Sequence, residues 1–402
     1  MSNDVPGPEF PVETYLERFS VPFEYPVHFT RRVFDARNGL LADVLDRLGE
    51  ERRHRATVYV DAGVAAAHPR LLDEIKEYFH ARGRAMELCG VPAVVPGGEA
   101  AKAGWSAVRD TMWTVGNLHL DRQSFVIAIG GGGLLDMVGF ATAIVHRGLR
   151  LIRVPTTTLS QNDAGIGVKN GMNEHGMKNF VGTFAPPFAV LNDFSFLPTL
   201  DGQHWIGGAA EAFKVAIIKD AEFFEFLCAS AQALRDRQAP PMEELIRRCA
   251  RLHLEHIGAS GDPFEFGSAR PLDFGHWAAH KIEAMSDFTF GHGQAVAVGI
   301  ALDSFIAMKL DLIARAQFDR IVGGLQDCGL PIWCDHLAAR GADGELIVLE
   351  GLEQFREHLG GVLTITLPKG IGRKVEVHHI SPDAVEQAAS HLQTLAKGRP
   401  SC

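Results

Sequence analysis

A buried strand that ends in four consecutive glycines is the feature that most constrains how this chain can fold. Residues 124–129 (SFVIAI) form an apolar run, Gly130 to Gly133 follow it, and a helical pattern begins at Leu134. Glycine lets the backbone approach a ligand closely, and the start of a helix offers free N–H groups to an anion. The pattern therefore suits a pyrophosphate. It is not the G-x-G-x-x-G fingerprint, and a plain tight turn is the alternative.

The first half of the chain alternates between strand and helix patterns. Residues 56–61 and 149–154 predict further strands, and residues 69–82 predict a helix. This alternation indicates a parallel sheet with helices packed on it. Helical periodicity dominates after residue 203, in stretches at 208–220, 221–234, 242–257, 276–285 and 294–310, before two short strands (363–367, 374–378) and a final helix (383–395). We expect an α/β domain over residues 1–200, beginning with an irregular arm (1–25), and a mainly helical domain over 201–402.

Composition excludes several classes of protein. The 402 residues carry 49 acidic and 39 basic side chains, a formal charge of −10, which argues against a nucleic-acid or anionic-membrane partner. No apolar run approaches the roughly 20 residues of a membrane span, and residues 1–10 lack the features of a signal peptide. Six scattered cysteines without a C-x-x-C pair indicate reduced thiols. We therefore expect a cytoplasmic protein.

Cationic side chains gather in the segment from residue 146 to residue 184. Three hydroxyl residues, Thr156 to Thr158, end the preceding strand, and the segment is otherwise rich in Gly and Asn. Long irregular segments inside compact domains are usually functional, and lysines can approach a phosphate as point charges. The alternative is a set of solvated surface side chains. The polar candidates are Arg147, Lys169, Lys178 and Asn179.

A glutamate and three histidines suggest a metal site in the helical half. Glu211 and Lys214 are three residues apart, and His276 and His280 are four apart, so each pair shares a helix face. His292 has a glycine on either side. One Glu and two His are a familiar open zinc set, although a structural histidine pair is the alternative.

Other polar residues have more ordinary interpretations. Asp61 ends a predicted strand, where it could bind a ribose hydroxyl or simply cap a helix. His253 and His256 share one predicted helix, and we expect a solvated or supporting role for them. His378 and His379 lie in a charged strand and are expected at the surface.

Taken in order, these motifs resemble the sugar phosphate cyclase superfamily, whose best-known member is 3-dehydroquinate synthase. The resemblance runs from about Asp61 to at least His292. It rests on matches to the motifs GGG-x-x-x-D (130–136), G-E-x-x-K (98–102), R-G-x-R-x-x-x-V-P-T-T (147–157), D-x-x-x-G-x-K (163–169), G-x-K-N (176–179) and F-L-x-T-L (196–200). It implies an α/β Rossmann-like NAD-binding domain followed by a mainly helical metal-binding domain.

The resemblance also implies roles for individual residues. NAD contacts would come from Asp61, Glu99, Lys102, Gly131, Gly132, Asp136, Thr156, Thr157, Lys178, Phe196 and Thr199. Zinc, or Co²⁺ in its place, would bind Glu211, His276 and His292. Substrate binding and catalysis would use Asp163, Lys169, Lys178, Asn179, Lys214, His280 and Arg147, the last reaching in from a second subunit of a homodimer.

Departures from the family pattern bear on the substrate. Dehydroquinate synthases have Asn where this chain has Asp273, and their substrate-carboxylate arginine falls on Ala269, beside Arg270. A substrate-binding lysine of theirs falls near Glu255. The F-R-E-H-L-G-G string (355–361) and Asp273 resemble cyclases that use sedoheptulose 7-phosphate, although those commonly have proline at the position of His280. The chain also resembles EboD-type proteins.

These features predict a lyase that turns sedoheptulose 7-phosphate, or a related sugar phosphate, into a carbocycle and releases phosphate. Three alternatives stay open. They are 3-dehydroquinate synthase proper, an NAD-dependent metal polyol dehydrogenase of the same fold, and a non-catalytic binding protein. The cationic set, which a polyol dehydrogenase does not need, favours the cyclase.

Overall fold

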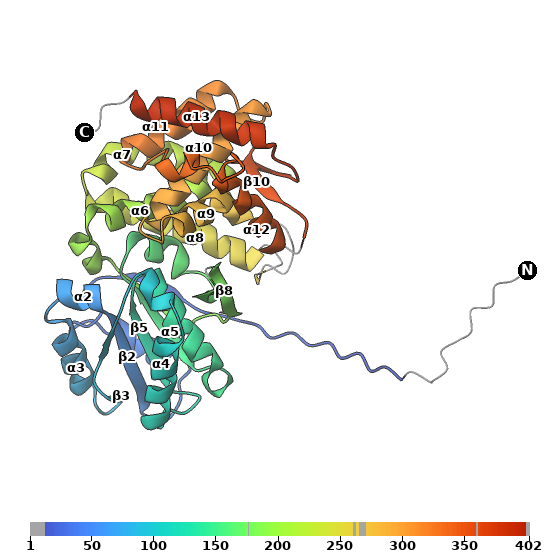
Figure 1. The fold of residues 1–402 in the computed structure, drawn as a ribbon. Helices are drawn as coiled ribbons and strands as arrows, with labels where there is room; N and C mark the ends of the chain where they lie inside the picture. Colours follow the sequence, from blue (N-terminus) through green and yellow to red (C-terminus); the bar gives the residue numbers. More distant parts are fainter. Residues whose placement is uncertain (1–12, 176, 260–262, 265–270, 359–360, 399–402) are drawn as a thin grey trace, which may run out of the picture.

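The computed structural model describes residues 13–175, 177–259, 263–264, 271–358 and 361–398. In these ranges the chain forms a sheet-containing part and a helical part, stacked one above the other in Figure 1. Residues 13–26 form an extended arm without helix or strand, which leads away from the rest of the molecule. Gly176 of the G-x-K-N motif and Arg270 lie outside the described residues.

The first part is built on a seven-stranded parallel sheet. The strands run in the order β1 (Val27–Thr30), β9 (Ala189–Asp193), β6 (Arg150–Pro155), β5 (Phe125–Gly130), β2 (His54–Asp61) and β3 (Met86–Leu88), and β4 (Ala93–Val95) also pairs with β2. All six residues of β5 are buried, which explains its unbroken apolar sequence. The predicted α/β class is confirmed.

Helices cover both faces of this sheet. Side chains of α1 (Leu40–Leu45) and α3 (Leu71–Ala81) join one apolar cluster with β2 and β5. Side chains of α4 (Ser106–Asn117) and α5 (Gly132–Ile144) join a second cluster on the other face. A short helix, α2 (Ala62–Ala67), follows β2 directly. Because the strands are parallel, the carboxyl ends of β2, β5, β6 and β9 meet at one edge of the sheet, where ligands bind in such folds.

The second part packs its helices around α10 (His292–Lys309), which is buried along nearly its whole length. The surrounding helices are α6 (Gly202–Lys219), α7 (Ala221–Arg235), α8 (Ala239–Ala259), α9 (His276–Met285), α11 (Arg315–Asp327), α12 (Glu350–His358) and α13 (Pro382–Lys397). A hairpin of β10 (Ile365–Pro368) and β11 (Lys374–Val377) completes this part. We keep the division near residue 200 as a proposal. It matches the start of α6, where Asp201 caps the helix by accepting a hydrogen bond from the backbone N–H of His204.

One sequence expectation is wrong in its detail. The segment from 146 to 184 is not irregular throughout, because β7 (Lys169–Glu174) and β8 (Met177–Phe184) form an antiparallel hairpin. The polar, glycine-rich sequence of this hairpin lacks the apolar alternation that marks a strand. The buried side chain of Arg153, on β6, holds the start of this hairpin in place. Its guanidinium donates hydrogen bonds to the carbonyl oxygens of Gly165, Gly167 and Lys169 and to Oδ1 of Asn170. Tertiary contacts thus supply what local propensity does not.

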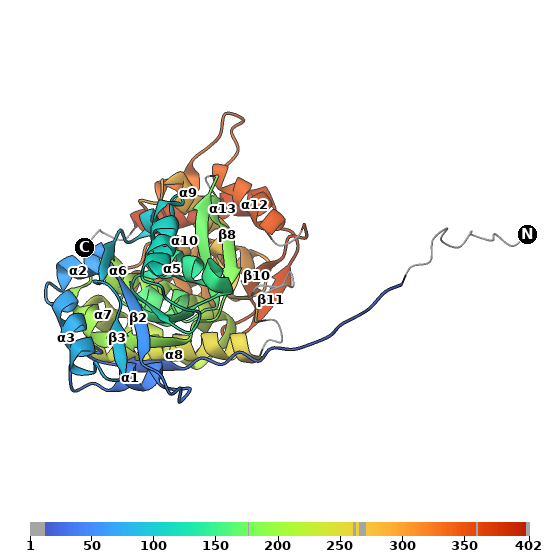
Figure 2. The ribbon, with the colours of Figure 1, turned by 90° about the horizontal axis from the view of Figure 1, so that it is seen from below.

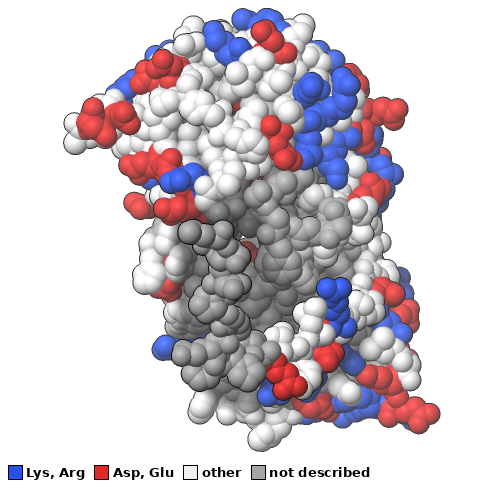
Figure 3. All heavy atoms as spheres, turned by 90° about the vertical axis from the view of Figure 1, so that its right-hand side faces the viewer, with Lys and Arg blue, Asp and Glu red and all other residues white. Residues whose placement is uncertain are grey.

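Surface charge is mixed. On the face that Figure 3 shows, acidic and basic side chains are interspersed over both parts of the molecule. Among the described residues, no helix is both long and apolar enough to cross a bilayer. The five described cysteines are all free thiols.

Candidate active site

A cavity of about 1000 Å³ brings residues of both parts together. Its walls include most of the residues that the sequence singles out. They are Asp61, Glu99, Lys102, Gly131, Gly132, Asp136, Thr156, Thr157, Asp163, Lys169, Lys178, Asn179, Phe196, Thr199, Lys214, His276, His280 and His292. Glu211 is fully buried behind this wall. A cavity of this size accommodates a dinucleotide with a second small molecule beside it.

Arg147 is the exception. It is exposed, with a left-handed backbone (φ +64°), and does not line the cavity. The expectation that it helps to hold a phosphate is therefore not met within a single copy of the chain.

The glycine run is explained by two different contacts. Gly131 and Gly132 line the cavity, and Gly131 is the N-cap of α5. A Cβ on Gly133 would lie 2.1 Å from the carbonyl oxygen of Gly98, so this glycine lets the loop before Glu99 pack onto the first turn of α5. The run is therefore more than a tight turn: it combines an open helix N-terminus with a close backbone contact.

Asp61 caps a helix, which is one of the two roles that the sequence suggests for it. Its Oδ1 accepts a hydrogen bond from the backbone N–H of Gly63, 2.8 Å away, at the start of α2. It also lines the cavity and fills the space beside Gly97, where a Cβ would meet its carboxylate at 1.9 Å. Capping fixes this carboxylate at the edge of the sheet.

The side chain of Lys102 contacts residues of three sequence motifs, through Glu99, Asp136 and Asn179. Its Nζ lies 2.7 Å from Oδ2 of Asp136 and 4.0 Å from Oε1 of Glu99, and it donates to Oδ1 of Asn179. Burial alone would lower the pKa of Lys102, but Asp136 and Glu99 outweigh it and raise the pKa. Lys102 therefore stays charged and fixes the hairpin against α5.

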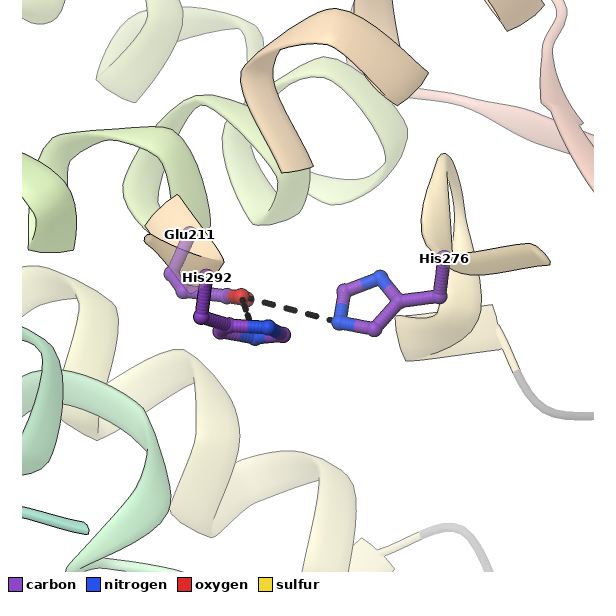
Figure 4. A group of neighbouring side chains, drawn as sticks. All are labelled: Glu211, His276 and His292. Carbon is purple, nitrogen blue, oxygen red and sulfur yellow. Dashed lines mark ion pairs between the residues drawn. The ribbon is translucent and has the colours of Figure 1, made fainter. Parts of the chain in front are cut away.

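The metal candidates converge, as Figure 4 shows. Nε2 of His292 lies 3.3 Å from Oε1 of Glu211, and Nε2 of His276 lies 3.6 Å from the same oxygen. One donor atom from each residue falls within 4.8 Å of the others. Tetrahedral ligands about 2.0–2.1 Å from zinc lie roughly 3.3 Å apart, so this donor set fits a zinc ion.

The second nitrogen of each imidazole has a partner that leaves Nε2 free for a metal. Nδ1 of His276 lies 3.2 Å from the carbonyl oxygen of Phe274. Nδ1 of His292 lies 3.0 Å from Oε2 of Glu283. Such partners fix the tautomer and orientation of metal-binding histidines. Sequence reasoning missed Glu283, although its position three residues after His280 on α9 is a signal.

Charges around the donor set keep its carboxylate ionised and act in opposite directions on its two imidazoles. Burial would raise the pKa of Glu211, but the ion pair with Lys214 and the contact with His292 lower it to about 2. Burial and neighbouring positive charges lower the pKa of His276 and of His280 well below the usual value, so both are neutral imidazoles. Burial would also lower the pKa of His292, but Glu283 and Glu211 raise it to about 9, so zinc would replace a proton on this imidazole.

Asp163 lies beside a histidine on the cavity wall. Its Oδ1 lies 2.8 Å from Nδ1 of His253, which comes from α8. Burial would raise the pKa of Asp163, and nearby Lys214 and His253 lower it, so the carboxylate is ionised. The supporting role expected for His253 agrees with this contact. His378 and His379 are exposed, as expected.

Comparison with known proteins shows the family of this chain. The family model for the 3-dehydroquinate synthase N-terminal region matches residues 92–207, and the model for the C-terminal region matches residues 208–345. The chain therefore belongs to the 3-dehydroquinate synthase family, within the sugar phosphate cyclase superfamily, and is an enzyme of that class. This confirms the resemblance seen in the sequence.

Three individual proteins show how similar this chain is to characterised sequences and structures. A 2-epi-valiolone synthase from Actinosynnema mirum is 30% identical over 372 residues, which cover 92% of each chain. A 3-dehydroquinate synthase from Shewanella frigidimarina is 34% identical over 277 residues, covering 67% of this chain and 74% of that one. The solved structure of ValA, a 2-epi-5-epi-valiolone synthase from Streptomyces hygroscopicus with NAD⁺ and Zn²⁺ bound, superposes with a TM-score of 0.84 at 28% identity. It covers 95% of this chain and 100% of that one.

Proposed function

We propose that this enzyme converts sedoheptulose 7-phosphate, or a closely related seven-carbon ketose phosphate, into a carbocycle and releases inorganic phosphate. The observation that carries this choice is Asp273, an acid in the cavity wall whose charge acts together with the larger effects of Glu211 and Asp163 to raise the pKa of Lys214. A carboxylate there repels the carboxylate of a keto-acid substrate but accepts hydrogen bonds from sugar hydroxyls. The full-length similarity to a 2-epi-valiolone synthase supports the same choice.

The cofactors of the proposed reaction are NAD and zinc. NAD would bind at the edge of the sheet, with its pyrophosphate at Gly131 and Gly132, and zinc would bind Glu211, His276 and His292. NAD supplies a hydride acceptor that later returns the hydride, and zinc supplies a Lewis acid for substrate oxygens.

The remaining residues would bind the substrate and move protons. Lys169, Lys178 and Asn179 line the cavity on the hairpin and would hold the phosphate. Asp163 and His280 would accept protons from hydroxyls, and the Lys214 ammonium would donate to a substrate oxygen. The exposed position of Arg147 leaves its side chain available to the cavity of a second copy, and we propose a homodimer on that basis.

A substrate panel tests the proposal. The purified enzyme, with NAD and zinc, is given sedoheptulose 7-phosphate, the seven-carbon keto-acid phosphate of the shikimate route, or glucose 6-phosphate. We expect release of inorganic phosphate from the first only, with no net gain in absorbance at 340 nm, and a carbocycle by NMR. Phosphate release from the keto acid alone would instead make the enzyme a 3-dehydroquinate synthase. Accumulating NADH would make it a dehydrogenase.

Asp273 itself provides a sharper test. Asp273→Asn removes the negative charge and keeps the size of the side chain. If this charge selects against a carboxylate, the variant should bind the keto-acid phosphate at least about tenfold more tightly than the parent, as a competitive inhibitor of phosphate release. Unchanged inhibition would remove Asp273 from the argument.

A further inference from the structure

A single buried carboxylate joins the proposed phosphate site to the proposed metal site. Glu283 lies on α9 with only 4% of its side chain exposed. Its Oε1 lies 2.5 Å from Nζ of Lys178, and its Oε2 lies 3.0 Å from Nδ1 of His292. Lys178 belongs to β8 in the first part of the molecule, whereas His292 begins α10 in the second. The two oxygens of one side chain thus bridge the two parts.

Lys178 and His292 both depend on the single negative charge of the Glu283 carboxylate. Nζ of Lys178 is also only 3.4 Å from Nδ1 of His292, so the carboxylate separates two donors that would otherwise repel when both are charged. A buried charge that loses its partner is strongly unfavourable. Any change in the charge on one donor therefore alters how tightly Glu283 holds the other.

We propose that Glu283 is a positioning residue that couples metal binding at His292 to phosphate binding at Lys178. A metal on Nε2 of His292 makes the opposite N–H a stronger donor and draws the carboxylate toward the ring. Lys178 is then held less firmly and is freer to bind a phosphate. By linkage, phosphate at Lys178 tightens metal binding by the same factor. The phosphate half of this inference rests on the proposed function, and the metal half does not.

A second metal ion is the competing explanation for this cluster. One atom each of His280, Glu283 and His292 also lies within 4.8 Å of the others. The Lys178 ammonium already occupies one oxygen of Glu283, however, and a cation bound there would have to displace it. We therefore assign Glu283 to positioning rather than to metal ligation.

Calorimetric titration of the full chain with zinc tests the coupling. Zinc affinity is measured in the presence of NAD, with and without saturating inorganic phosphate, and the ratio of the two affinities is the coupling factor. We expect a factor of roughly ten for the parent, within the usual range for coupled sites. In Glu283→Gln, zinc affinity without phosphate should fall about 10- to 100-fold, and the factor should fall to about one.

Matched variants separate the possible results. Glu350→Gln removes another carboxylate that pairs with α9, through Lys281 at 2.6 Å, and should leave the factor at the parent value. Lys178→Met should abolish the factor without the large loss in zinc affinity. Glu283→Asp, whose far-ultraviolet circular dichroism and melting temperature are compared with the parent, provides a test if the glutamine variant does not fold. It keeps the charge and should retain part of the factor.

Two outcomes are informative in different ways. If phosphate binds Lys178→Met as tightly as it binds the parent, the phosphate assignment of the proposed function fails. If phosphate binding needs Lys178 but the coupling factor of Glu283→Gln equals that of the parent, zinc and phosphate interact directly through space. The inference about Glu283 is then wrong while the proposed function stands.

Discussion

The two sides of the cavity are built by different means. On the nucleotide side, close backbone contacts shape the wall: the start of α5, the glycine that ends β5 and the loop at Gly98, with Asp61 held by a local cap. On the metal side, the wall is a set of buried ionisable side chains on α6, α9 and α10. The first side depends on close backbone contacts in addition to the Lys102 ion pairs, and the second depends mainly on charges that balance one another away from water.

This difference indicates which kind of substitution should disrupt each side of the cavity. A backbone wall fails when a Cβ is added, because nothing in it can move aside. A charged wall fails when one member is removed, because its neighbours keep their charge without a partner. The following predictions test this contrast, from the largest expected effect to the smallest.

Removing the central carboxylate should have the largest effect. Glu211→Ala takes away the oxygen nearest to both imidazoles and leaves the Lys214 ammonium buried without its partner. We expect phosphate release to fall by about 10³-fold, and zinc content, measured by mass spectrometry of the metal, to fall with it. His292→Ala should behave in the same way. Glu222→Ala, at an exposed position on α7, is the control. Full activity in a zinc-free variant would refute the metal assignment.

The second prediction concerns a buried carboxylate whose hydrogen bonds, within the described part of the chain, come from neutral donors. Asp303 on α10 accepts from the backbone N–H of Gly275 at 2.9 Å and from Nε1 of Trp277 at 2.8 Å, on either side of His276. Burial outweighs these bonds and raises the pKa of Asp303 to about 7. The folded state thus binds a proton that the unfolded state releases at a lower pH.

The sign of the effect on stability follows from this shift. The stabilising contribution of protonated Asp303 is complete below the unfolded pKa of about 4 and is lost as the pH rises through about 7. The amide of Asp303→Asn does not ionise, so the stability of the variant does not decrease in this way as the pH rises. Between pH 5 and pH 8, the free energy of unfolding of the variant should therefore rise relative to that of the parent by about 3 kcal/mol, as measured by urea denaturation. A difference that does not vary with pH would show that Asp303 ionises normally.

The nucleotide side should respond to added bulk. Gly133→Ala places a methyl group against the carbonyl oxygen of Gly98 and should push the loop at Glu99 away from α5. We expect NAD affinity, measured by fluorescence titration, to fall about tenfold while zinc content is unchanged. Gly323→Ala on α11 places its methyl group more than 4 Å from every described neighbour and should leave NAD affinity at the parent value. Equal NAD affinity in the two variants would mean that this contact does not shape the nucleotide site.

Several elements of the fold were predictable because their signals are local. The apolar run at β5, the glycines that follow it and the helix start at α5 lie within about twenty residues and depend on backbone geometry. The same holds for α7, which was predicted nearly to its ends. The β7–β8 hairpin was not predictable, since its residues are polar and its base is held by Arg153 from a neighbouring strand.

The sequence by itself determined the chemistry that is available: the glycine run, the family motifs, and one glutamate with two histidines on predicted helices. Only the tertiary structure decided which groups meet. It brought Glu211, His276 and His292 from three helices to one point, and it set Glu283 between His292 and Lys178. It also left Arg147 outside the cavity. The physical reason is that motifs follow local backbone rules, whereas partners for buried charges are chosen by how whole helices and strands pack.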